Sequence, residues 1–348
     1  MSRSPRPTTE ERLQAAEDQL ADAVDNLVTS EDWIRAIQFA AQFRSRSFNN
    51  TLLIWAQHFG AYEQGRVPEP TPTYVAGYRT WQRLGRQVQA GQPGYVVLAP
   101  VTGRFSSATP ESTSSWRRLS RGENPKPGES VNTRLVGVRP AYVWDASQTA
   151  GEPIPTHPAP RLLEGQAPEG LWDGLAKQIE DHGFGLRLVS NARAIGGANG
   201  LTDFTSREVS VRMDMDDAAQ TKTLAHELAH VLLHGPNSED AFLHRGVAEV
   251  EAESVALMIG AVHGLDTSSY TVPYVASWSE SVPGRTPIEV IHETAERVRG
   301  TALRVLDHLP TQQTGDGNPP GLDALRTRSA PTIVAPSRVV AAEPWMSL

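Results

Sequence analysis

The spacing of apolar positions divides the first part of the chain into helices followed by strands. Apolar residues recur at helical intervals over 9–28, 29–42 and 47–60. The stretch 73–101 has the pattern of a strand, a short helix, a Gly-rich turn and a second strand, and the run 133–147 alternates as a strand does. Residues 103–132, rich in Ser, Thr, Gly and Pro, are expected to form a mobile insertion.

The second part mixes short strands with longer helices. The pattern predicts strands at 185–189, 200–204 and 207–212, and helices at 170–182, 217–234, 247–263 and 288–309. We therefore expect an α+β fold with two domains. The expected boundaries are 1–150 for the first domain, 151–165 for a linker, 166–310 for a second, compact domain and 311–348 for a disordered tail.

Composition narrows the class of protein. Apolar residues make up 39% of the 348 positions and charged residues 21%, as in a globular protein. Cysteine is absent, which excludes disulfides, thiol nucleophiles and zinc fingers. The sequence starts without an apolar leader and has no apolar run long enough to cross a membrane. We expect a cytoplasmic protein without a membrane partner.

Charge is distributed unevenly along the chain. The net charge is −8, yet residues 33–144 carry 14 Lys and Arg against five Asp and Glu, together with 15 of the 23 aromatic residues. Guanidinium groups contact phosphates and aromatic rings stack on unpaired bases, so this mixture suits single-stranded DNA, and duplex DNA as a further partner. The alternative is an ordinary solvated basic surface. The candidate DNA-binding residues are Arg44, Arg46, Asn49, Asn50, Arg79, Trp81, Arg83, Arg86 and Arg139.

The clearest chemical motif lies in the predicted helix 217–234. His226-Glu227-Leu-Ala-His230 is an HExxH sequence, and residues four apart on a helix share one face. His226 and His230 are therefore predicted to bind one metal ion. Glu227, beside that face, is predicted to act as the general base toward a metal-bound water.

The third ligand is expected from the next helix, because catalytic zinc usually has three protein ligands and one open position. The sequence Glu249-Val-Glu-Ala-Glu253 places its first and last acids on one face. We assign Glu249 as the third ligand of zinc (Zn2+) and Glu253 as the partner that orients a ligand histidine. The reverse assignment, and a merely solvated acidic face, remain the alternatives.

Long stretches of the chain resemble a known family. SFNN, VAGYRTWQRLGRQVQAGQPGYVVLAPV and VGVRPAYVWDASQTAGEPIP resemble the N-terminal domain of ArdC-like antirestriction proteins. The placement of these stretches ahead of HELAH and EAESVA is also similar, over roughly residues 10–310. The resemblance implies a single-stranded-DNA-binding domain followed by a zincin-like metallopeptidase domain, in a protein that protects incoming DNA from restriction.

The leading hypothesis is therefore an ssDNA-binding, zinc-dependent metallopeptidase with an unidentified peptide or protein substrate. The strand 207–212, just before the HExxH helix, is expected to be the edge on which an extended peptide adds. Two alternatives stay open. The first alternative is a DNA-coating protein with a non-proteolytic metal site. The second is a regulatory zinc protease that cleaves a protein partner.

Overall fold

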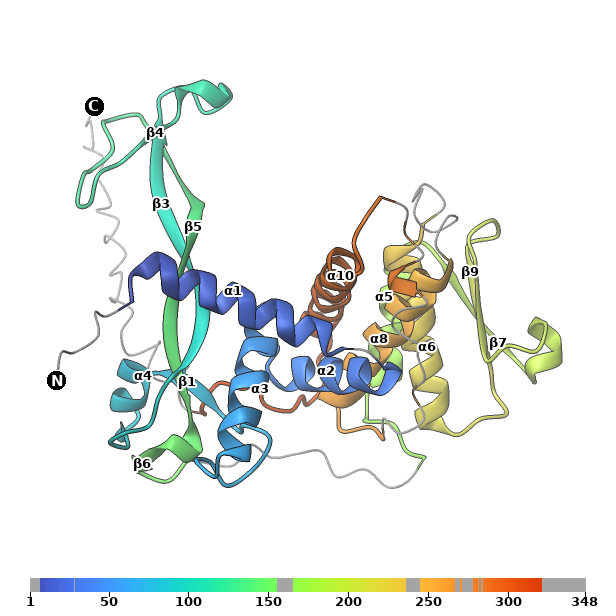
Figure 1. Ribbon diagram of the computed structural model, residues 1–348. Coiled ribbons are helices and arrows are strands. Elements are labelled where there is room, and N and C mark those ends of the chain that lie inside the picture. The colour runs from blue at the N-terminus through green and yellow to red at the C-terminus, as the bar shows by residue number, and fades with distance from the viewer. Residues whose placement is uncertain are drawn as a thin grey trace, which may run out of the picture.

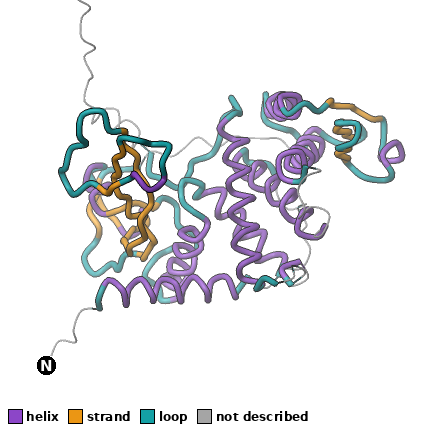
Figure 2. Tube along the Cα trace, turned by 90° about the horizontal axis from the view of Figure 1, so that it is seen from above, coloured by secondary structure: helices purple, strands orange, loops and turns teal. Residues whose placement is uncertain are grey.

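Among the described residues, a four-stranded and a two-stranded sheet lie on one side of a central group of helices, and a three-stranded sheet lies on the other (Figures 1 and 2). In the computed structural model the described residues are 7–27, 29–154, 165–235, 245–266, 270, 278–280, 282 and 284–320. Helices and strands are mixed as the hydrophobic pattern predicts, and the α+β class is confirmed. In the described part of the chain, no helix combines the length and the apolar character that a membrane span requires.

The first part begins with helices whose starts are capped by their own side chains. At α2, Thr29 Oγ1 accepts a hydrogen bond from the Asp32 backbone N–H, and Asp32 accepts one from the Thr29 N–H in return. The elements of this part are α1 Thr9–Asp25, α2 Ser30–Gln42, α3 Phe48–Glu63, β1 Val75–Gly77, α4 Tyr78–Arg83, β2 Arg86–Val88, β3 Tyr95–Ser107, β4 Arg117–Arg118, β5 Ser130–Asp145 and β6 Thr149–Gly151.

The expected mobile insertion is instead the far end of a long hairpin. Strands β3 and β5 pair antiparallel from Tyr95↔Val143 to Ser107↔Ser130, with a bulge next to Val101, and β4 pairs with the outer end of β3. The ribbon extends well beyond the helix α1 that crosses it (Figure 1). Arg117 bonds Glu123 and Glu129 and so closes the end of the hairpin. Backbone pairing, which composition does not reveal, places 103–107, 117–118 and 130–132 in one sheet.

The second part combines a small sheet with four long helices. Strand β9 lies in the middle of the sheet, parallel to β7 and antiparallel to β8. The helices lie on one side of it (Figure 1). The elements are α5 Leu171–Asp181, β7 Gly185–Val189, β8 Gly200–Asp203, β9 Glu208–Arg212, α6 Asp217–Leu233, α8 Arg245–Val262 and α10 Pro287–Asp307.

One hydrophobic core joins the two parts. Trp33 of α2 is fully buried, donates a hydrogen bond from Nε1 to Ser254 Oγ of α8 at 2.9 Å, and packs edge-on against Trp278. Residues of α1, α2 and α3 and residues of α5, α6, α8 and α10 belong to the same buried cluster. The two expected domains therefore share packing that stabilises both.

A segment after α10 adds to this connection. Residues 311–320 were expected to start a disordered tail, but they run from α8 to β1. Thr314 N–H donates to Val262 O at 2.8 Å, and Gly317 O accepts from Val75 N–H at 2.9 Å. Gly317 has φ +83°, and a Cβ there would meet the Phe43 ring, so glycine is required. The rest of the tail, 321–348, and the expected linker residues 155–164 lie outside the described residues.

Candidate metal centre

The HExxH histidines are half-buried and lie on the side of a well-anchored helix that faces α8. Asp216 caps α6 by accepting a hydrogen bond from the Ala219 N–H at 2.8 Å, and the opposite face of the helix is buried. His226 and His230, one turn apart, have ring centroids 4.8 Å apart. Their Nε2 atoms are 3.0 Å from each other. The local helix geometry alone therefore aims two imidazole nitrogens at one point.

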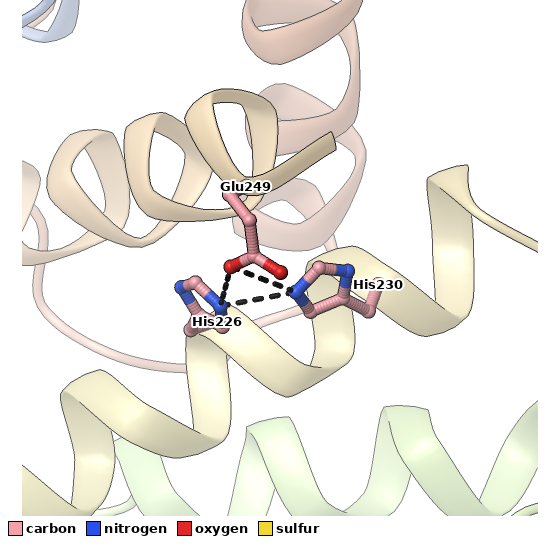
Figure 3. A group of neighbouring side chains, drawn as sticks. All are labelled: His226, His230 and Glu249. Carbon is pink, nitrogen blue, oxygen red and sulfur yellow. Dashed lines mark hydrogen bonds and ion pairs between the residues drawn. The ribbon is translucent and has the colours of Figure 1, made fainter. Parts of the chain in front are cut away.

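Glu249 supplies a third donor from α8 (Figure 3). Its Oε2 lies 3.5 Å from His226 Nε2 and 3.8 Å from His230 Nε2. The ligand atoms of these three residues lie within 4.8 Å of one another, so they could hold a metal ion. Two imidazole nitrogens and one carboxylate oxygen are a donor set that zinc accepts, with a fourth position left for water or substrate. The residues present fit the ion that the motif implies.

Glu253 lies behind His226, one turn along α8 from Glu249. Its Oε2 accepts a hydrogen bond from His226 Nδ1 at 3.2 Å, and its Oε1 pairs with Lys222 at 2.9 Å. Burial opposes a charge on His226, but the carboxylates of Glu249 and Glu253 outweigh it and raise the pKa of His226 to about 9. The site thus attracts positive charge at the point where the three donors meet.

A second set of residues, which the sequence pattern did not reveal, lies behind His230. His230 Nδ1 is 2.9 Å from His234 Nδ1, and His234 Nε2 is 3.0 Å from Glu251 Oε2. Arg297 of α10 donates to the same Glu251 oxygen at 2.7 Å. Burial and the neighbouring histidines lower the pKa of His230 to about 3, which favours a neutral ring. The further i+4 step from His230 to His234 was the available signal. Glu251 lies off the face that Glu249 and Glu253 share, and it is fully buried.

Glu227 lies beside the three donors and is held by the sheet. Only 5% of its surface is exposed, and Thr202 Oγ1 of β8 donates to its Oε2 at 2.7 Å. Burial raises the pKa of Glu227 above its usual range. Gly200 allows this approach, because a Cβ there would lie 2.5 Å from Glu227 Oε1. A cleft of about 820 Å³, walled by β8, α6 and α8, opens onto the donors and Glu227.

The strand beside the cleft is not the one expected. Strand β9, which makes up all but the first residue of the expected peptide-binding run 207–212, is covered on both sides by β7 and β8. Val209 and Val211 are fully buried in the core. The edge strand next to the HExxH helix is β8, which lines the cleft through Gly200, Leu201 and Thr202. Sequence order does not give spatial order here, because the chain places β9 between two strands that precede it.

Comparison with known proteins identifies the first domain. Residues 11–137 match the family described as the N-terminal domain of anti-restriction factor ArdC. These residues are therefore similar to an ArdC N-terminal domain, and we use the name ArdC domain for the first part of the chain, 7–154, which contains them. The predicted resemblance to ArdC-like proteins is confirmed on this basis.

Other similar proteins extend beyond the ArdC domain. An uncharacterized protein of Bacillus anthracis is 24% identical over 338 residues, which is 88% of this chain. The chain spans about half, 54%, of the length of that relative. The metal-free crystal structure of antirestriction protein ArdC from plasmid R388 is 20% identical, with a TM-score of 0.48, and covers 84% of this chain and 97% of its own. The Mn(II)-bound structure is 22% identical, with a TM-score of 0.42, and covers 76% and 88%.

Several candidate DNA-binding residues of the ArdC domain hold the fold together instead. Arg44 donates to the carbonyls of residues 314 and 315, and Arg46 donates to Val75 O at 2.6 Å. Burial lowers the pKa of both. Asn50 pairs with both backbone groups of Leu98 in β3. These half-buried side chains are therefore bonded to backbone groups of the fold.

Trp81 and Arg86 are also engaged within the ArdC domain. The Trp81 ring is fully buried and donates from Nε1 to Trp144 O at 3.0 Å, so it cannot stack on a base. Arg86 donates to Thr149 Oγ1 at 2.9 Å and to the carbonyls around β6. Asn49 is half-buried, and its Oδ1 has no hydrogen-bond partner among the described residues. Composition could not separate core aromatics and bonded arginines from exposed ones.

Three of the candidates do lie on the surface of the ArdC domain. Arg79 and Arg83 on α4 and Arg139 on β5 are exposed. Tyr78 of α4 and Tyr142 of β5, which the sequence did not single out, are 43% and 40% exposed. The Tyr78 ring contacts the ring of Trp144, two residues beyond Tyr142 on the same strand. Exposed cations and exposed aromatic rings therefore do occur together near α4.

Proposed function

We propose that the chain is an ssDNA-binding, zinc-dependent metallopeptidase-like protein that protects incoming DNA from restriction in the cytoplasm. The observation that carries the proposal is the convergence of His226, His230 and Glu249 beside Glu227, in a chain whose first domain matches an anti-restriction family. We assign the two functions to the two expected domains: residues 1–150 bind DNA, and residues 166–310 form the metallopeptidase-like part.

The chemistry follows from the donors and the cleft. Zinc held by His226, His230 and Glu249 would supply Lewis acidity toward a peptide carbonyl and lower the pKa of water to about 7. Glu227, which lines the cleft beside the donors, would accept the proton of the attacking water and pass it to the leaving amine nitrogen. Thr202 donates to Oε2 of Glu227 and so restricts the rotation of its carboxylate.

The substrate in this proposal is an extended peptide. Strand β8 is an edge strand, and it borders the cleft beside Glu227. An extended chain can add to such an edge through backbone hydrogen bonds, which fix its direction without demanding a particular sequence. We therefore replace the expected docking strand 207–212 by β8.

For the ArdC domain the proposed partner is single-stranded DNA. The basic excess of residues 33–144 supports phosphate contacts, and the exposed side chains of Arg79, Arg83 and Arg139 are available to make them. Tyr78 and Tyr142 replace Trp81 as the candidates for stacking on bases. Protection from restriction is inferred from the family that this domain matches.

Three measurements on the whole chain test the proposal: zinc content, peptide cleavage and DNA binding. Wild type should contain about one zinc per chain by elemental analysis and cleave unstructured peptides, whereas Glu227→Gln should keep zinc and lose cleavage. Both proteins should bind a fluorescent single-stranded oligonucleotide equally. Zinc and DNA binding without any cleavage would instead favour a DNA-coating protein with a non-proteolytic metal site. Absence of DNA binding would favour a protease directed at a protein partner.

A further inference from the structure

The two ligand histidines are supported in different ways. His226 meets a carboxylate directly, since its Nδ1 bonds Glu253. His230 instead meets another imidazole, because His234 lies between its Nδ1 and the carboxylate of Glu251. The side chains of His234 and Glu251 are only 5% and 1% exposed. A buried carboxylate at the end of such a chain constrains where every proton in it lies.

The proton positions follow from the chemistry of each group. Arg297 balances the charge of Glu251, so that carboxylate acts only as an acceptor. A neutral His234 then carries its proton on Nε2, where it donates to Glu251, and this leaves a lone pair on its Nδ1. His230 Nδ1, 2.9 Å away, must donate to that lone pair. The proton of a neutral His230 is then on Nδ1, and its Nε2 presents a lone pair to the metal position.

We propose that His234 and Glu251 form a relay that holds His230 in the tautomer and orientation required for metal binding. The inference rests on the metal centre proposed above, and it makes His234 a positioning residue rather than a ligand. Arg297 belongs to α10 and bonds Glu251, so the relay connects a third helix to the HExxH motif of α6. Partners of this kind usually change metal affinity by about 10- to 100-fold when they are removed.

A capping role alone does not account for His234. Its backbone N–H closes the last turn of α6 by bonding His230 O at 2.9 Å, which any residue except proline would do. The side chain contributes nothing to that bond, yet it is buried and bonded at both ring nitrogens. Burying a polar ring is costly unless both nitrogens are satisfied, so its place between His230 and Glu251 is specific.

Two substitutions of similar size separate the relay from simple packing. His234→Leu fills the space but can neither accept from His230 nor donate to Glu251. His234→Gln offers an amide oxygen to accept from His230 and an amide N–H to donate to Glu251. In chelator-competition titrations of the whole chain, we expect His234→Leu to weaken zinc binding about 10- to 100-fold. His234→Gln should recover most of that loss.

A spectroscopic readout tests the tautomer without any metal. With ¹⁵N-labelled histidine, metal-free wild type should show the His230 proton on Nδ1, and His234→Leu should shift it toward Nε2. His263→Leu is the matched control, because His263 is also fully buried and bonded at both nitrogens, to Ile259 O and Thr311 Oγ1. That control should lower thermal stability but leave both the tautomer and the zinc affinity unchanged.

The outcomes distinguish the relay from the metal centre. A His230 proton on Nε2 in metal-free wild type would overturn the relay, and so would unchanged zinc affinity in His234→Leu. If zinc is nevertheless lost from His230→Ala, the metal centre stands without the relay. If wild type shows the Nδ1 tautomer but binds no zinc, the relay is supported and the proposed function fails.

Discussion

Functional residues were predicted from the sequence both for the metal centre and for the ArdC domain, but the structure brings the predicted residues together only at the metal centre. In the first, HExxH and a pair of acids one turn apart name His226, His230 and Glu249, and the structure brings these three together. In the second, an excess of arginine and aromatic residues names Trp81 and several arginines that prove to be buried or bonded within the fold. Both predictions began from chemically suitable residue types.

The difference lies in what fixes the position of each side chain. Residues four apart on a helix must share a face, so spacing translates directly into geometry. An excess of charge over a hundred residues fixes no geometry, and buried backbone carbonyls compete with a ligand for every guanidinium group. Arg44 shows the competition clearly, because carbonyls of residues 314 and 315, some 270 positions away, engage it. A motif with fixed spacing is therefore stronger evidence than a biased composition.

The largest expected effect tests whether the HExxH motif is the metal site. The double substitution His226→Ala/His230→Ala removes both nitrogen donors, so we expect complete loss of zinc from the purified protein by elemental analysis. The His292→Ala protein should keep its zinc, because that half-buried histidine of α10 is not among the donors. Zinc retained at one equivalent by the double variant would show that the motif is not the metal site.

The next largest effect distinguishes a buried aromatic residue of the ArdC domain from an exposed one that could contact DNA. Trp81→Ala empties a fully buried position and removes the bond to Trp144 O, so it should destabilise the protein by about 3–5 kcal/mol in chemical denaturation. Tyr78→Ala, at an exposed ring on the same helix, should leave stability nearly unchanged and weaken single-stranded DNA binding by about 1–3 kcal/mol. The opposite pattern would return Trp81 to the DNA-binding surface.

Much of the fold could be predicted because local signals decide it. The helices around Trp33 and His226 follow from apolar spacing and from capping residues such as Thr29 and Asp216. What could not be predicted depends on contacts far apart in sequence. The central place of β9, the strand pairing within 103–132 and the bonds of Arg44 to residues near 315 all follow from tertiary packing.

In the candidate site, too, the residues set by local spacing could be predicted, and those brought in by contacts far apart in sequence could not. Its three donors and Glu227 were accessible from spacing on two helices. Thr202, which orients Glu227, lies on a strand 25 residues earlier, and Arg297 lies on a helix 46 residues after Glu251. No local pattern links these residues to the motif, since only the packing of β8 and α10 against α6 and α8 brings them there.

A smaller effect separates a metal ligand from its support. Glu249→Ala removes a donor atom and should empty the site, whereas Glu253→Ala leaves the three donors in place and should weaken zinc affinity by about 10- to 100-fold. Chelator competition measures both. Glu17→Ala, at an exposed acid of α1 remote from the centre, is the control and should leave affinity unchanged. If Glu253→Ala empties the site and Glu249→Ala does not, the two roles are exchanged.

The smallest effect asks whether any arginine of the ArdC domain contacts phosphates. Arg79→Ala/Arg83→Ala removes two exposed charges from α4. Each phosphate contact to a single strand contributes about 0.7 to the slope of log affinity against log salt, so the slope should fall by up to about 1.4. Fluorescence anisotropy at four or more salt concentrations measures this slope.

The matched control for this last test is Arg35→Ala. Arg35 is also exposed, but it lies on α2 and bonds Asp32 at 2.7 Å, and we expect its removal to leave the salt slope unchanged. Stability should not change in either protein, because surface charges contribute little to it. An unchanged slope in the α4 variant would mean that these two arginines do not contact DNA. The basic excess of residues 33–144 would then be explained by the arginines that hold the fold together and by a solvated surface, and the DNA-binding proposal would lose its structural support.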